Sequence, residues 1–138
     1  MKLFRAMKMS GDGLPELGRT KRTLGVRPGN LAPNNDVLAI RPDDVVNPGV
    51  GGMSVAPDEP IHLPRFLRPP AFGGTGKDPV WVIDEADLPP ELTVRRDKAI
   101  HGMIEPKTDM TLTEYESALA STRGEWQLVP PPTVGGQP

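Results

Sequence analysis

Glycine and proline account for 15 and 18 of the 138 residues and interrupt the chain at short intervals. Most of them lie between short apolar runs, of which residues 80–83 (Val-Trp-Val-Ile) form the clearest. Proline removes a backbone donor and clashes with the preceding helical turn, so this spacing leaves room for few helices. Short apolar runs rich in β-branched side chains favour strands. We therefore expect a strand-rich α+β domain with few helices and long Pro/Gly-rich loops.

Five segments are predicted to form strands: residues 3–9, 53–56, 80–83, 92–95 and 102–105. Residues 37–40 form either a strand or a buried turn. Side chains on a strand repeat every two residues, so Arg5 is expected on the same face as Leu3 and Met7. The two glycines that precede residues 53–56 allow a backbone or a ligand to approach closely.

One helix is expected, late in the chain. Thr111 and Glu114 match a capping box, in which the hydroxyl and the carboxylate each accept a hydrogen bond from a free backbone N–H. Apolar side chains follow at three- and four-residue spacing, the pattern of a helix that buries one face. Gly124 is expected to end the helix. We take residues 1–128 as a single domain and residues 129–138 as a disordered Pro/Gly tail.

The composition excludes several classes of site and protein. The chain has no cysteine, and two histidines are too few for a histidine-rich metal site, so we expect no metal. A formal net charge of −2 argues against a general nucleic-acid binder, which needs a basic excess. No apolar run approaches the roughly 18–20 residues of a membrane span, and charges interrupt the N-terminal segment. We therefore expect a cytoplasmic protein without a signal peptide or a membrane partner.

A basic stretch near the N-terminus contains Arg19, Lys21, Arg22 and Arg27. This basic stretch is either a solvated loop or a surface that contacts a pyrophosphate or a protein partner. Residues 73–77 resemble a phosphate-binding loop in composition, but the spacing differs and Asp78 and Pro79 block a following helix.

The sequence gives little support to two hydrolase hypotheses. A serine hydrolase would need Ser54 in a nucleophile elbow with a base such as His101, but the flanking glycine frame is absent. Carboxylate pairs suited to a glycosidase arise by chance among 18 acidic residues.

Three short motifs follow one another along the chain: residues 3–6 around Arg5, residues 51–55 around Ser54, and residues 101–106 around Glu105. This order resembles that of the arginine-serine-glutamate ADP-ribosyltransferases. Residues 4–6, 42–46, 51–55 and 88–94, and more loosely 101–115, resemble the cytotoxic type VI secretion effectors of the Tse group, which have an ADP-ribosyltransferase-like fold. The resemblance implies a small split β-sheet. It also implies an intracellular toxin with NAD as its substrate, which transfers ADP-ribose to a macromolecule or hydrolyses NAD.

The resemblance assigns catalytic roles to Glu105, Ser54 and Arg5. Cleavage of the nicotinamide–ribose bond develops positive charge on the ribose, and a carboxylate beside that carbon, Glu105, would stabilise it. A guanidinium, Arg5, would grip the pyrophosphate or the ribose in a bidentate way. The short hydroxyl of Ser54 would order the nicotinamide ribose.

The residues expected to bind NAD are Arg5, Gly52, Ser54, Phe72, Trp81 and His101. Phe72 and Trp81 are expected to form an aromatic wall for the nicotinamide, with His101 near the ribose. Each assignment has a structural alternative. Arg5 would be an ion-pair partner, Ser54 a small residue in a crowded strand, Glu105 a strand-end carboxylate and Trp81 a core residue.

Met103 departs from the pattern of arginine-modifying transferases, which carry a carboxylate or an amide two residues before the catalytic glutamate to activate the acceptor. We therefore expect hydrolysis of NAD or modification of a non-arginine acceptor. The second hypothesis is a non-enzymatic domain on the same fold that binds a protein. In either case the expected partner is a cognate immunity or antitoxin protein that plugs the cleft.

Overall fold

The computed structural model describes residues 1–132. Its strands are β1 (Lys2–Ala6), β2 (Val45–Val46), β3 (Met53–Pro57), β4 (Val80–Asp84), β5 (Leu92–Lys98), β6 (His101–Pro106), β7 (Met110–Thr111) and β8 (Gln127–Leu128). Its helices are α1 (Leu112–Ser121) and the 3-10 turns η1 (Gly29–Leu31), η2 (Pro60–His62), η3 (Pro70–Phe72), η4 (Glu85–Asp87) and η5 (Arg123–Glu125).

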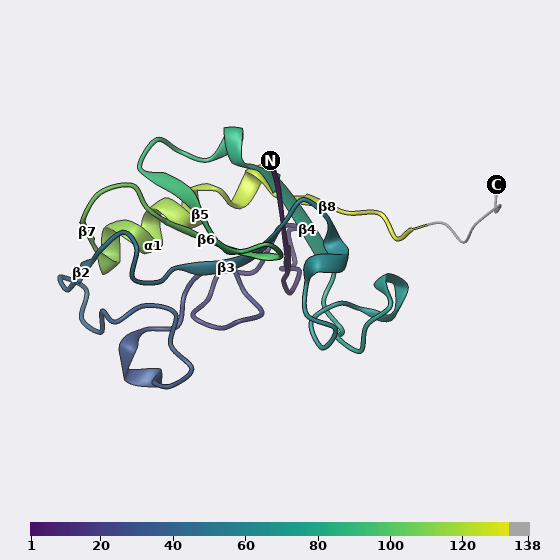
Figure 1. Ribbon diagram of the computed structural model, residues 1–138, viewed down its shortest axis with the longest axis horizontal. Coiled ribbons are helices and arrows are strands. Elements are labelled where there is room, and N and C mark those ends of the chain that lie inside the picture. Colours follow the sequence, from purple (N-terminus) through teal and green to yellow (C-terminus); the bar gives the residue numbers. More distant parts are fainter. Residues whose placement is uncertain (133–138) are drawn as a thin grey trace.

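Six of the strands form one antiparallel sheet of order β5-β6-β3-β1-β4-β8 (Figure 1). The two short strands β2 and β7 pair separately. The N-terminal strand therefore lies inside the main sheet, between β3 and β4. The prediction of an α+β fold with few helices and long loops is confirmed.

Helix α1 begins where the capping box predicts. The Thr111 hydroxyl accepts from the Glu114 N–H at 3.1 Å, and the Glu114 carboxylate accepts from the Thr111 N–H at 3.0 Å. The predicted stop at Gly124 is wrong, because the helix ends at Ser121. The hydroxyl of Thr122 donates back into the last turn, and the chain continues as the 3-10 turn η5.

Apolar side chains pack on both faces of the sheet. The main core joins alternate strand residues such as Leu3, Val55 and Ile104 to the buried face of α1. A second cluster on the opposite face packs Phe4 against Leu63, which belongs to the long segment between β3 and β4. In Figure 1 this teal segment and α1 accordingly lie on different sides of β3.

Tyr115 fastens α1 to the sheet. Its hydroxyl accepts from the Met53 N–H at 3.1 Å and donates to the Ile104 carbonyl. Met53 and Ile104 are register partners, so the hydroxyl bridges β3 and β6. Burial raises the pKa of Tyr115 well above its ordinary value, which keeps the hydroxyl protonated as a donor.

The sheet splits between β1 and β3. These strands pair only at Leu3 with Pro57 and at Phe4 with Ala56. An unbroken antiparallel ladder would continue with Arg5 opposite Val55 and Ala6 opposite Ser54. Instead the Ser54 carbonyl accepts from Nη1 of Arg5 at 2.7 Å, so a side chain takes the place of the next strand contact.

Two strand predictions need adjustment. The first strand ends at Ala6 rather than at residue 9. The Met7 N–H still donates to the Pro79 carbonyl in the register of β1 and β4, but Pro79 has no N–H with which to continue the ladder. Residues 37–40 form no strand; Val37 is buried and Leu38 is exposed, as in the buried-turn alternative.

The C-terminal part of the described chain lies along the sheet edge. Strand β8 pairs with β4, and the Val129 N–H then donates to the Val80 carbonyl at 2.9 Å. Residues 133–138 of the predicted tail lie outside the described residues.

Candidate functional site

A cavity of about 370 Å³ lies at the split in the sheet. The strands contribute Arg5, Ser54 and His101 to its lining, and two loop segments, residues 21–36 and 62–67, supply most of the rest. Its volume falls within the range of roughly 300–1,000 Å³ that is typical of small-molecule sites. Three of the residues predicted for the site thus line one cavity.

Arg5 is a buried cation that contacts only neutral acceptors. Its side chain donates to the carbonyls of Thr23 at 2.8 and 3.1 Å, Ser54 at 2.7 Å and Thr20 at 3.3 Å. No carboxylate among the described residues forms an ion pair with it. Burial lowers the pKa of Arg5 to about 10, against a raising effect of Asp36. The structural alternative of an ion-pair partner is therefore wrong for Arg5.

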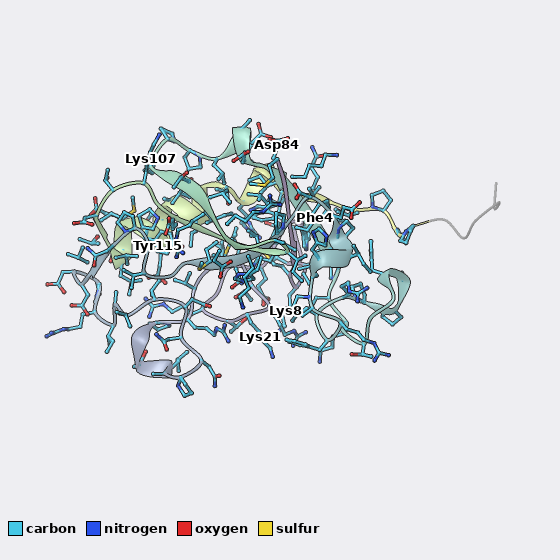
Figure 2. The ribbon with its side chains drawn as sticks, in the orientation of Figure 1. Phe4, Lys8, Lys21, Asp84, Lys107 and Tyr115 are labelled. Atoms are coloured by element: carbon cyan, nitrogen blue, oxygen red, sulfur yellow. The ribbon has the colours of Figure 1, made fainter. Side chains whose placement is uncertain are left out.

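The basic stretch is mostly paired within the protein. Its arginines form ion pairs of Arg19 with Glu116, Arg22 with Asp78 and Arg27 with Asp36. Lys21 has no ion pair within residues 1–132, and its Nζ lies 5.2 Å from the ring centre of Phe66. Lys21, which Figure 2 labels below β3, and Phe66 both line the cavity. With Arg27 neutralised by Asp36, Arg5 and Lys21 leave the cavity positive, which suits an anionic ligand.

Ser54 lies on β3, next to the strand that carries the other predicted motif. Its register partner on β6 is Met103, whose partner on β5 is Arg95. His101 and Glu105 stand two residues to either side of Met103 and so share its face. Diagonal neighbours on adjacent strands lie roughly 7–8 Å apart, within reach of long side chains. The fold thus brings Ser54, His101 and Glu105 to one face of the sheet.

Glu105 is closed off from the cavity. The residue is only 5% exposed and does not line the cavity. Its carboxylate accepts from the Gly49 N–H at 2.7 Å and from Nε of Arg95 at 3.1 and 3.2 Å. The turn that contains Gly49 therefore covers one side of Glu105, and Arg95 neutralises it.

His101 is open to the cavity and carries a carboxylate partner. Its Nδ1 lies 2.6 Å from Oδ1 of Asp97. Burial works to raise the pKa of Asp97, but the hydrogen bond and charge of His101 outweigh it and lower that pKa. Asp97 is therefore an ionised acceptor, and Nδ1 of His101 is the donor.

The two predicted aromatic residues lie elsewhere. Trp81 is 1% exposed in the main core, where its indole N–H donates to the Met7 carbonyl at 2.9 Å. Phe72 lies in a separate depression beside Pro60. Both expectations of an NAD wall are corrected, because the aromatic side chain at the cavity is that of Phe66.

Gly52 shapes the strand rather than the cavity lining. It has φ +148°, and a Cβ there would lie 2.7 Å from the Ile104 carbonyl oxygen. Its N–H donates to the Asp36 carbonyl at 3.0 Å. The expected close approach is confirmed, but the approaching group belongs to the protein's own backbone.

Four cavity features escaped the sequence reasoning: Lys21 as an individual contact, Phe66, His62, and the Asp97 partner of His101. Phe66 carried a usable signal, since an aromatic residue among prolines and arginines is out of place in a solvated loop. The other contacts depend on long-range folding and left no local pattern.

Two features are absent from residues 1–132. No group of three or more His, Cys, Asp or Glu side chains there is arranged to hold a metal ion. No helix in that part of the chain has the length and apolar character needed to cross a membrane.

Comparison with known protein families assigns the chain to one of them. The family described as Tse2 ADP-ribosyltransferase toxin matches residues 1–126. Comparisons with curated proteins and with solved structures find no match. Because the family match spans most of the 138 residues, the chain belongs to this family, and the expected Tse-type relationship is confirmed.

Proposed function

We propose that the chain, as a member of the Tse2 ADP-ribosyltransferase toxin family, cleaves the nicotinamide–ribose bond of NAD. The ADP-ribose passes to a macromolecular acceptor or to water. The observation that carries the proposal is the cavity at Arg5, where a buried guanidinium without a described carboxylate partner meets a cavity of about 370 Å³. A pyrophosphate there would offset the cost of burying that charge.

The proposed roles follow the positions of the side chains. Arg5 and Lys21 attract the phosphates, with Nη1 of Arg5 still having a second N–H to offer. Ser54 orders the nicotinamide ribose beside the split. Glu105, on the same face, stabilises the positive charge on the ribose once the Gly49 turn moves aside.

The decisive experiment measures nicotinamide release from NAD by the wild-type protein and by Glu105→Gln, with and without cell lysate as a source of acceptor. We expect release by the wild type and a loss of roughly 100-fold or more in Glu105→Gln. Glu125→Gln is the matched control, because Glu125 is exposed and lies outside the cavity lining. Equal silence of the wild type and Glu105→Gln under all conditions would refute the enzymatic proposal.

The closed position of Glu105 favours a second candidate function. If its pairing with Arg95 and Gly49 persists, the domain is a non-enzymatic toxin that binds a protein. Toxicity that survives Glu105→Ala would support this candidate.

The family also supports two proposals about context. A cognate immunity or antitoxin protein covers the cavity and neutralises the toxin, and the toxin acts in the cytoplasm of a target cell after type VI secretion. Co-expression with the neighbouring gene tests the first: restored growth and a stable complex are expected.

A further inference from the structure

The hairpin of β5 and β6 contains an irregularity at one residue. Arg96 pairs with Gly102, but Lys98 rather than Asp97 pairs with His101, so the register shifts at Asp97. An extra residue of this kind re-aims a side chain, and such bulges are frequent beside active sites. Here the shift places the Asp97 carboxylate on Nδ1 of His101.

This arrangement determines what His101 offers to the cavity. Asp97 occupies Nδ1, so the ring edge that carries Nε2 remains for other contacts. Because Nδ1 holds the proton, Nε2 of the neutral ring has a free lone pair. His101 is also a diagonal neighbour of Ser54 on the same face of the sheet.

The proposed reaction needs a group that removes a proton from the acceptor. Met103 has no such group. Glu105 is held by Arg95 outside the cavity, and once released it faces the ribose charge in the role proposed above. Of the other charged groups that face the cavity, Arg5 and Lys21 are cations and Asp36 is paired with Arg27. These groups do not supply a free base.

The second cavity histidine is placed differently. Nδ1 of His62 donates to the Pro57 carbonyl at 2.7 Å, and its Nε2 lies 3.9 Å from the exposed carboxylate of Glu59. A neutral carbonyl stabilises a protonated imidazole less than a carboxylate in direct contact does. His101 is therefore the better base of the two.

We propose that His101, positioned by Asp97, is the general base that activates the acceptor, which is water or a hydroxyl group; this rests on the function proposed above. The acceptor oxygen forms a bond to C1′ of the ribose, and the C1′–N bond breaks with its electron pair leaving on neutral nicotinamide. The acceptor proton moves to Nε2 of His101. Asp97 stabilises the resulting imidazolium through Nδ1–H.

The test compares His101→Gln, Asp97→Asn and the wild type in nicotinamide release across pH. We expect kcat of His101→Gln to fall by roughly 100-fold or more with KM for NAD unchanged within about twofold. The wild-type rate should fall in acid as the imidazole takes up a proton, and this acid limb should be absent in His101→Gln. Asp97→Asn should reduce kcat by roughly tenfold or more.

The controls separate a base from a structural contact. Asp58→Asn is the control for Asp97→Asn. It makes the same substitution at an exposed aspartate whose partner, Arg96, lies on this hairpin, and its kcat and pH profile should match the wild type. His62→Gln should keep the acid limb. Wild-type kcat and an intact acid limb in folded His101→Gln would overturn this inference and leave the proposed function standing. A wild-type protein that releases no nicotinamide would instead refute the proposed function.

Discussion

Two arginines reach the neighbourhood of Ser54, Arg5 from β1 and Arg95 from β5, and they meet different partners. Arg5 is buried, lines the cavity and, within residues 1–132, donates hydrogen bonds only to backbone carbonyls. Arg95 is partly exposed and neutralises Glu105. A buried charge without a counter-charge marks the side of the site that is suited to a ligand, whereas a neutralised pair marks the side that is closed. The difference separates Arg5, the proposed ligand-binding group, from Glu105, the proposed catalytic carboxylate.

The largest effect is expected from Arg5→Ala. Removal of the guanidinium leaves the carbonyls of Thr23 and Ser54 without these donors, and each buried unsatisfied group costs about 1–3 kcal/mol. We expect a loss of at least about 3 kcal/mol in the free energy of unfolding and loss of NAD binding, measured by urea denaturation and calorimetry. Arg41→Ala, at a largely exposed side chain, should stay within about 0.5 kcal/mol of wild type. Equal stability of the two variants would remove Arg5 from its structural role at the split.

Arg95→Ala should have an intermediate effect. Glu105 keeps the Gly49 N–H but loses its charged partner, so we expect a loss of about 2 kcal/mol in the free energy of unfolding. Arg96→Ala is the neighbouring control, because its partner Asp58 is exposed, and it should cost less than about 1 kcal/mol. If the costs of Arg95→Ala and Arg96→Ala do not differ, the closed side of the site does not depend on charge neutralisation.

Gly49→Ala should have the smallest effect. Gly49 has φ +83°, and a Cβ there would meet no atom within 4 Å, so backbone strain alone should cost about 1 kcal/mol. The strain should loosen the turn over Glu105. Hydrogen exchange of the residue-49 amide, which donates to Glu105, and of the Gly52 amide, which donates to the Asp36 carbonyl, would detect this. Gly11→Ala is a control without positive φ and with equally open space. Unchanged exchange at residue 49 and at Gly52 in Gly49→Ala would show that the turn is held by other contacts.

The parts of the fold that were predictable depend on local patterns. The capping box at Thr111 and the apolar run at Val80 need only neighbours in sequence, and both elements form as expected. The short motifs around Arg5 and Ser54, together with residues 42–46 and 88–94, were sufficient to predict the family, which the comparison confirms.

The rest depends on strand register and on loops. Trp81 is an aromatic residue of the kind that can line a ligand site. Its side chain instead packs in the main core, together with residues of α1. The contact of Asp97 with His101 requires a one-residue shift in the pairing register of β5 and β6, which no local residue pattern predicts. The pairing of Arg5 with backbone carbonyls, rather than with a carboxylate of residues 1–132, likewise depends on where residues 20–23 return to the sheet.

The guanidinium of Arg5, which replaces a strand contact at the split, also affects the interpretation of mutations in a genetic experiment. A selection for harmless variants of a toxin gene would recover Arg5 substitutions through two defects at once, loss of folded protein and loss of ligand. Substitutions of Lys21, which makes no described hydrogen bond or ion pair, would enter the same collection only through the ligand. Protein abundance measured in parallel with survival would therefore separate the two residues, although they line the same cavity.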